Sequence, residues 1–218
     1  MNLVDALARF NRKERYWLIR NALGRSSARL DDAFRDQLKL AIGKEEVPTD
    51  AWWAMDYHLD WLIGALSLVA DDKSVHQVRP NSLNFVTGSQ EDMDLVVAFD
   101  NVLVLIEAKG ETAWSNSQFN SKVARLEAVR EAGLLPGSVE VFFVVMSPRA
   151  PDGLVARPDS PWQAWMCDPN GRPRHIPLKM DEDFLKVTRC DEVSGQPDSK
   201  GKSWKIVPAR GAAKLDEG

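Results

Sequence analysis

The spacing of hydrophobic residues predicts helices in the first third of the chain. One apolar stripe with helical spacing runs through residues 2–23. A second runs through 28–42, with Gly43 where a helix would stop. A third and stronger stripe follows Thr49, a suitable N-cap, and continues through several tryptophans to about residue 70. We therefore expect three successive helices.

The pattern changes after Asp72 and becomes typical of a sheet. Short strand-like pieces at 75–80 and 82–88 precede two clear apolar strands at 94–99 and 102–108. A helix is expected over 115–133. A strand at 139–148, apolar on both faces, is expected in the interior of the sheet. Residues 164–178 resemble a hairpin around a Pro-Asn-Gly turn, and residues from 194 on are poor in hydrophobics.

This order predicts an α/β fold with a mixed sheet, preceded by N-terminal helices. We divide the chain into an N-terminal helical segment (1–48), a core with a C-terminal β appendage (49–193) and a loose tail (194–218). The 218 residues, 44% apolar and 28% charged, suffice for one domain with its own core. No run approaches the length of a membrane span, and the charged N-terminus is unlike a signal peptide.

Charge and cysteine content narrow the functional classes. The net charge of −4 excludes a globally basic nucleic-acid binder. The two cysteines, Cys167 and Cys190, are too few for a disulfide framework and lack metal-ligand spacing. Reduced thiols of this kind are typical of a cytoplasmic protein, which is the location we expect.

The stretch "VLVLIEAKGE" (102–111) reads as a buried strand, yet it ends in charged residues. If Asp100–Asn101 form a two-residue turn, Phe99 faces Val102, and the same register sets Asp94 opposite Glu107. One face of this hairpin is then apolar near the turn and charged at its open end. Two opposed carboxylates repel each other, so a divalent cation or a lysine salt bridge must compensate, and the pattern allows either.

Asp94, twelve intervening residues and then Glu107-Ala108-Lys109 resemble the PD-(D/E)xK nuclease superfamily, the restriction-endonuclease-like proteins. Met93 stands where the motif's proline would be. The resemblance covers about residues 49–147 and implies an αβββαβ core. It also implies Mg²⁺, with Mn²⁺ as a substitute, held by Asp94, Glu107 and the Ala108 carbonyl. Lys109 would orient or deprotonate the attacking water.

The implied activity is hydrolysis of phosphodiester bonds in nucleic acid, with DNA favoured and a homodimer possible. The alternative is a non-catalytic nucleic-acid- or protein-binding module on the same fold. Some members add an acidic residue from the first core helix, where Asp56 and Asp60 are candidates, although both also suit a solvated helix flank. A further catalytic candidate is Gln118, because some members carry Gln-x-x-x-Tyr there. This chain has Lys122 in place of the tyrosine, and both residues also suit a solvated helix face.

A basic stripe on the first helix is the candidate for substrate binding, together with Lys122. Its members, Arg9, Lys13 and Arg20, share one face with Tyr16 at helical spacing. The alternative is a solvated face paired with nearby acids.

Overall fold

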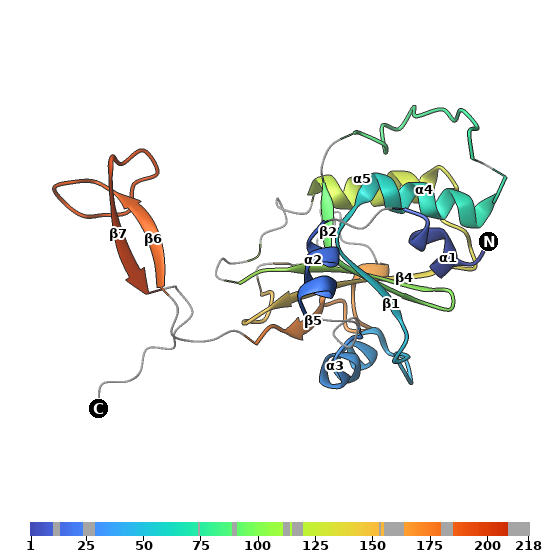
Figure 1. The fold of residues 1–218 in the computed structure, drawn as a ribbon, viewed down its shortest axis with the longest axis horizontal. Helices are drawn as coiled ribbons and strands as arrows, with labels where there is room; N and C mark the ends of the chain where they lie inside the picture. Colours follow the sequence, from blue (N-terminus) through green and yellow to red (C-terminus); the bar gives the residue numbers. More distant parts are fainter. Residues whose placement is uncertain are drawn as a thin grey trace.

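The computed structural model describes residues 1–10, 14–23, 29–73, 75–88, 91–110, 114, 120–152, 154, 164–179 and 185–208 (Figure 1). Its helices are α1 (Leu3–Ala8), α2 (Glu14–Leu23), α3 (Asp32–Ile42), α4 (Leu59–Ala70), α5 (Asn120–Glu131) and the 3₁₀ turn η3 (Ala164–Met166). Its strands are β1 (Trp52–His58), β2 (Asp92–Phe99), β3 (Val102–Ala108), β4 (Glu140–Ser147), β5 (Arg174–Pro177), β6 (Leu185–Cys190) and β7 (Ser203–Pro208).

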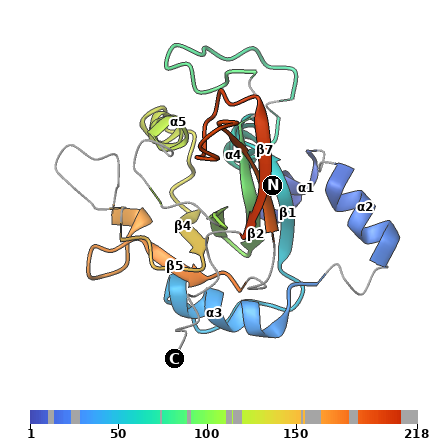
Figure 2. The same ribbon diagram turned by 90° about the vertical axis from the view of Figure 1, so that its left-hand side faces the viewer.

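A five-stranded mixed sheet in the order β1-β2-β3-β4-β5 organises the molecule. The first three strands pair antiparallel, whereas β4 is parallel to both β3 and β5. Helices α4 and α5 lie over one face and α3 over the other, as two views of the ribbon agree (Figures 1 and 2). This arrangement confirms the expected α/β class with a mixed sheet.

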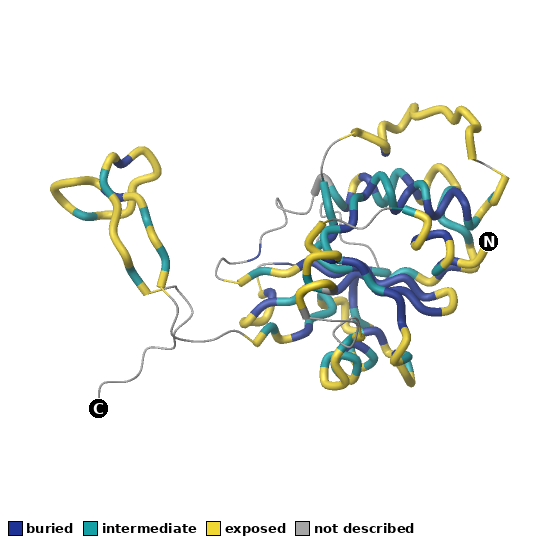
Figure 3. Tube along the Cα trace, in the orientation of Figure 1, coloured by how far each residue is buried: buried dark blue, intermediate teal, exposed yellow. Residues whose placement is uncertain are grey.

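Two apolar layers result from the alternation of side chains along the central strands. Val96, Ala98, Leu103 and Leu105 pack with the α1, α4 and α5 side. The intervening residues, including Val104, pack with α3. Strand β3 is buried from Val102 to Glu107, and the central strands accordingly appear dark in Figure 3.

The β2–β3 hairpin has the register expected from the sequence. Its pairs run from Leu95↔Ile106 to Phe99↔Val102. Asp100 opens the turn with a φ of 48°, a left-handed conformation that aspartate tolerates better than most residues. The predicted strand at 139–148 is β4, flanked by β3 and β5. The predicted helix at 115–133 is α5 from Asn120, and residues 115–119 lie outside the described part.

The expectation of one helix from Thr49 to residue 70 is wrong for its first half. Trp52–His58 form β1, which pairs with β2 from Trp52↔Ala98 to His58↔Asp92, and the helix begins only at Leu59. Backbone pairing to a distant strand outweighs local helical spacing, and Trp and Tyr suit strands well. The described residues within 75–80 and 82–88 contain no strand, so the sheet takes its extra strand from before α4.

The N-terminal prediction of a single helix over 2–23 is also wrong. Helix α1 ends at Ala8, with Arg9 as its C-cap, and α2 is a separate helix that begins at Glu14. The buried residues of α1 pack in the same apolar core as those of α4. Helix α3 agrees better with the prediction, because Gly43 ends it with a φ of 67°.

The C-terminal third departs from the prediction in two ways. The turn at Gly171 exists, but its flanks form only an isolated bridge between Cys167 and Pro173, and β5 joins the main sheet parallel to β4. The expected loose tail is wrong over 203–208, because β7 pairs antiparallel with β6 in a second sheet. Both cysteines are buried and free. No described helix is long and apolar enough to cross a membrane.

Candidate active site at the open end of the β2–β3 hairpin

The open end of the β2–β3 hairpin brings the predicted carboxylates together. The backbone register of the hairpin extends to Leu95↔Ile106, and beyond it Asp94 contacts β3 through its side chain. The Ala108 N–H donates to Asp94 Oδ2 at 2.7 Å. Because the N–H and C=O of a strand residue leave on the same side, the Ala108 carbonyl also belongs to the β2 side of β3.

Glu107 is a buried carboxylate, only 8% exposed, on the α4–α5 side of the sheet. Burial raises its pKa most, the Lys122 charge lowers it and the neighbouring Asp94 charge raises it, so that the pKa is about 7. A carboxylate that is both desolvated and close to a second negative charge is stabilised by an added cation. This electrostatic situation fits a metal-binding role.

Lys122, on the first turn of α5, supplies a cation at this position. Its ammonium forms an ion pair with Glu107 and donates to the Asp92 main-chain carbonyl at 2.6 Å. Its side chain is 16% exposed. The structure therefore places Lys122 against the Glu107 carboxylate of the site, whereas the sequence predicts that it binds nucleic acid.

Lys109 follows directly after β3, where its N–H donates to the Met146 carbonyl of β4 at 2.8 Å. Its Nζ lies 5.5 Å from the centre of the Trp114 ring. Burial lowers the pKa of the Lys109 ammonium, and the negative charge of Glu107 opposes that change. A lysine with a lowered pKa is a better proton acceptor near neutral pH than an ordinary lysine.

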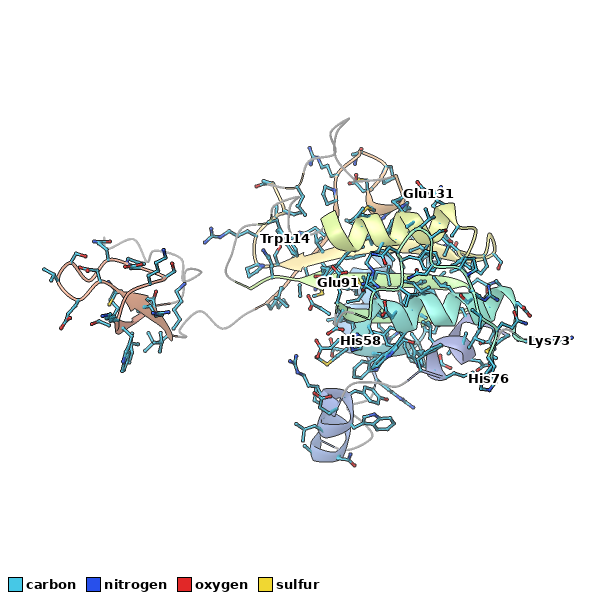
Figure 4. All side chains as sticks on the ribbon, turned by 90° about the horizontal axis from the view of Figure 1, so that it is seen from above. His58, Lys73, His76, Glu91, Trp114 and Glu131 are labelled. Carbon is cyan, nitrogen blue, oxygen red and sulfur yellow. The ribbon has the colours of Figure 1, made fainter. Side chains whose placement is uncertain are left out.

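Trp114 lies against Lys109 and is a residue that sequence reasoning missed. It is 6% exposed, and its indole N–H donates to Ser147 Oγ at 2.7 Å. The Ser147 hydroxyl in turn donates to the Arg149 carbonyl at 2.7 Å. Figure 4 shows Trp114, Glu91 and His58 toward one end of the α4–α5 layer, whereas Lys73 and His76 lie toward the other. A lone tryptophan outside any periodic pattern gave no signal of this role.

His58 and Asp92 form a second missed contact, on the β1 flank of the hairpin. They are paired across β1 and β2, and His58 Nδ1 lies 3.2 Å from Asp92 Oδ1. The Trp61 ring packs edge-on against the imidazole, with 4.4 Å between the ring centres. The contact could not be predicted from the sequence, because the apolar spacing predicts a helix at His58 and not the end of a strand.

The residues that fit a metal ion are Asp94, Glu107 and the Ala108 carbonyl. All three supply oxygen, the donor type that Mg²⁺ and Mn²⁺ prefer. Within the described ranges, no group of three or more His, Cys, Asp and Glu side chains is arranged to hold a metal ion. Any ion here would therefore rest on two carboxylates, a main-chain carbonyl and water.

The other predicted site residues do not join this cluster in the described part of the chain. Gln118 and Lys13 lie outside the described residues. Arg9 is exposed at the end of α1, and Arg20 lies in α2 with a side chain that is not described. Because α1 and α2 are separate helices, the single basic stripe is not formed. Tyr16 is 5% exposed and packs on Trp53, with 5.1 Å between ring centres.

The two acidic candidates from the expected helix have other partners. Asp56 lies in β1 at a positive φ of 47° and pairs with Arg15 at 2.9 Å. Asp60, on α4, forms an ion pair with the buried Arg125 and accepts the Gly88 N–H at 2.8 Å. Neither carboxylate is directed to the candidate metal position by these contacts.

No family model, curated protein or solved structure matches this chain.

Proposed function

We propose that this protein is a metal-dependent nuclease that hydrolyses phosphodiester bonds of nucleic acid, with DNA as the favoured substrate. The observation that carries the proposal is the open end of the β2–β3 hairpin. There Asp94 accepts the Ala108 N–H, and a buried Glu107 with a raised pKa lies beside it. Lys109 follows two residues later in the chain. The spacing is that of the PD-(D/E)xK motif.

The order of elements gives independent support. The run α3, β1, β2, β3, α5 and β4 follows the αβββαβ order of restriction-endonuclease-like proteins if α4 is an insertion between β1 and β2. The antiparallel β1–β2–β3 meander followed by a parallel β4 suits a crossover through α5. We propose that the sheet belongs to this fold.

In the proposed reaction, Asp94, Glu107 and the Ala108 carbonyl would hold a divalent cation. When bound, the ion supplies Lewis-acid polarisation of the phosphate and its water. Lys109 accepts a proton from the attacking water as the water oxygen forms a bond to phosphorus. The P–O bond to the leaving group then breaks, and the leaving oxygen takes a proton from solvent. The Lys109 ammonium lies over the Trp114 ring, and burial keeps its pKa below that of an ordinary lysine.

The test is a cleavage assay on plasmid, linear duplex, single-stranded DNA and structured RNA, each with Mg²⁺, Mn²⁺ or EDTA. Wild type should cleave at least one substrate only with metal, and Lys109→Ala should not. Lys109→Arg keeps the charge but is a poor base at neutral pH, so it should also lose most activity.

Equal cleavage by wild type and Lys109→Ala would indicate a contaminating nuclease. Bound nucleic acid without cleavage by wild type would contradict the enzyme and favour a non-catalytic binding module. Circular dichroism of each variant shows whether the fold is retained.

A further inference from the structure

The ammonium of Lys122 contacts oxygen atoms of two different strands of the sheet. One is a carboxylate oxygen of Glu107 on β3, and the other is the Asp92 carbonyl on β2, 2.6 Å from Nζ. The Lys122 and Glu107 side chains are 16% and 10% exposed, so water competes weakly for this contact. These two contacts of Lys122 are separate from the hydrogen bond that joins Asp94 to Ala108 on the same hairpin.

Carboxylate and main-chain carbonyl oxygens are also what a hard divalent ion would use. In sites with two metal ions, the ions lie about 3.5–4 Å apart and often share one carboxylate. Glu107 has the position of such a shared ligand, because Asp94 approaches it on one strand and Lys122 contacts it from α5. A lysine ammonium is a compact point charge with donors that can be directed at several oxygens, so it can replace an ion in such a position.

We propose that Lys122 is the second cation of this site: its ammonium takes the place beside Glu107 that a second divalent ion would occupy, and the protein binds one ion. This inference rests on the proposed function and refines it. Lys122 acts here as a positioning residue, because it fixes the Glu107 carboxylate and sets the number of ions. The predicted consequence is a change in stoichiometry when the charge is removed.

The experiment is a Mn²⁺ titration of the full chain by calorimetry, with electron paramagnetic resonance on the same samples. Wild type should bind one Mn²⁺ and give the spectrum of an isolated ion. Lys122→Ala and Lys122→Gln remove the charge and should bind two, with the broadened spectrum of a coupled pair. The glutamine keeps most of the side-chain length and a donor for the Asp92 carbonyl, which guards against loss of the fold.

Lys122→Arg is the matched control, because it keeps the charge and should still bind one ion. One ion in wild type and one in both neutral variants would overturn the role of Lys122 while leaving the proposed metal site intact. Two ions in wild type would overturn it directly. No ion in wild type would overturn the proposed function and this inference together.

Discussion

Helix α5 directs two basic side chains toward carboxylates, and the two contacts differ in kind. Arg125 donates from Nε to the Phe85 carbonyl at 3.0 Å and from Nη1 to Glu91 at 2.8 Å, and it also forms an ion pair with Asp60. Lys122, three residues earlier and thus on a neighbouring position of the helix, meets a single carboxylate and a carbonyl.

The two contacts leave different carboxylates available for chemistry. The planar guanidinium of Arg125 matches its partners at several points and is 8% exposed, so it ties the segment before β2 to α4 and α5. Asp60 takes part in this structural contact and also accepts the Gly88 N–H. Glu107 has the compact ammonium of Lys122 as its partner and a raised pKa, which suits a carboxylate that can also serve as a metal ligand.

The largest effect is expected from Arg125→Met. This change leaves Asp60 and Glu91 without their buried partner, and breaking such a pair costs about 3–5 kcal/mol. Guanidinium unfolding should show that loss in the free energy of unfolding. Arg130→Met, an exposed position on the same helix, is the control and should change stability by less than about 0.5 kcal/mol. Equal losses in the two variants would show that the buried contacts of Arg125 stabilise the fold no more than an exposed arginine does.

An intermediate effect on the free energy of unfolding is expected when the pH is raised. Burial raises the Glu107 pKa from its ordinary 4.5 to about 7, so folding favours the protonated form. The resulting stability is fully present below pH 4.5 and is lost as the pH rises through about 7. At about 1.4 kcal/mol per pKa unit, the loss approaches about 3 kcal/mol.

Urea unfolding of the metal-free protein between pH 4.5 and 8 measures this loss, with Glu107→Gln as the reference. Other groups titrate in both proteins, so the difference between the two curves isolates Glu107. Parallel curves across this range would contradict the raised pKa.

The smallest effect is expected from Lys122→Met at low pH. At pH 5, below the Glu107 pKa of about 7, this carboxyl is protonated and leaves no unpaired charge when the ammonium is removed, so the loss in the free energy of unfolding should be about 1 kcal/mol, the net value of an ordinary hydrogen bond. At pH 8 the loss should be larger, because the carboxylate then has neither proton nor partner. Thermal denaturation at the two pH values tests this. A loss as large as that of Arg125→Met at pH 5 would show that the two contacts are equivalent.

Sequence reasoning located the hairpin because a two-residue turn fixes its register, and the apolar alternation agrees with that register. Once Asp100–Asn101 is assigned as the turn, the register places Asp94 at the end of β3. The same reasoning failed for β1, because Trp52–His58 fits a helical stripe and becomes a strand only by pairing with residues about forty positions later.

The site was predictable only where its residues lie close together in the chain. Asp94, Glu107 and Lys109 belong to one hairpin and could be found together. Trp114 could not, because its contact with Lys109 depends on the path of the chain after β3. The contact between Lys122 and Glu107 depends on how α5 lies on the sheet, which a helical pattern alone does not specify.

The turn at Asp100–Asn101 also bears on the order in which the molecule folds. An isolated hairpin closes in about 1–10 μs, whereas pairing β1 with β2 must enclose α4 and the long segment after it. We expect Leu103→Ala in β3 to slow folding, with a φ-value well above that of Trp53→Ala in β1. Stopped-flow kinetics across a denaturant series measures both, and equal values would contradict early hairpin formation. On this account, the Asp94 and Glu107 carboxylates come together while β1 is still unpaired, so a cation could act on the folding chain as well as on the folded protein.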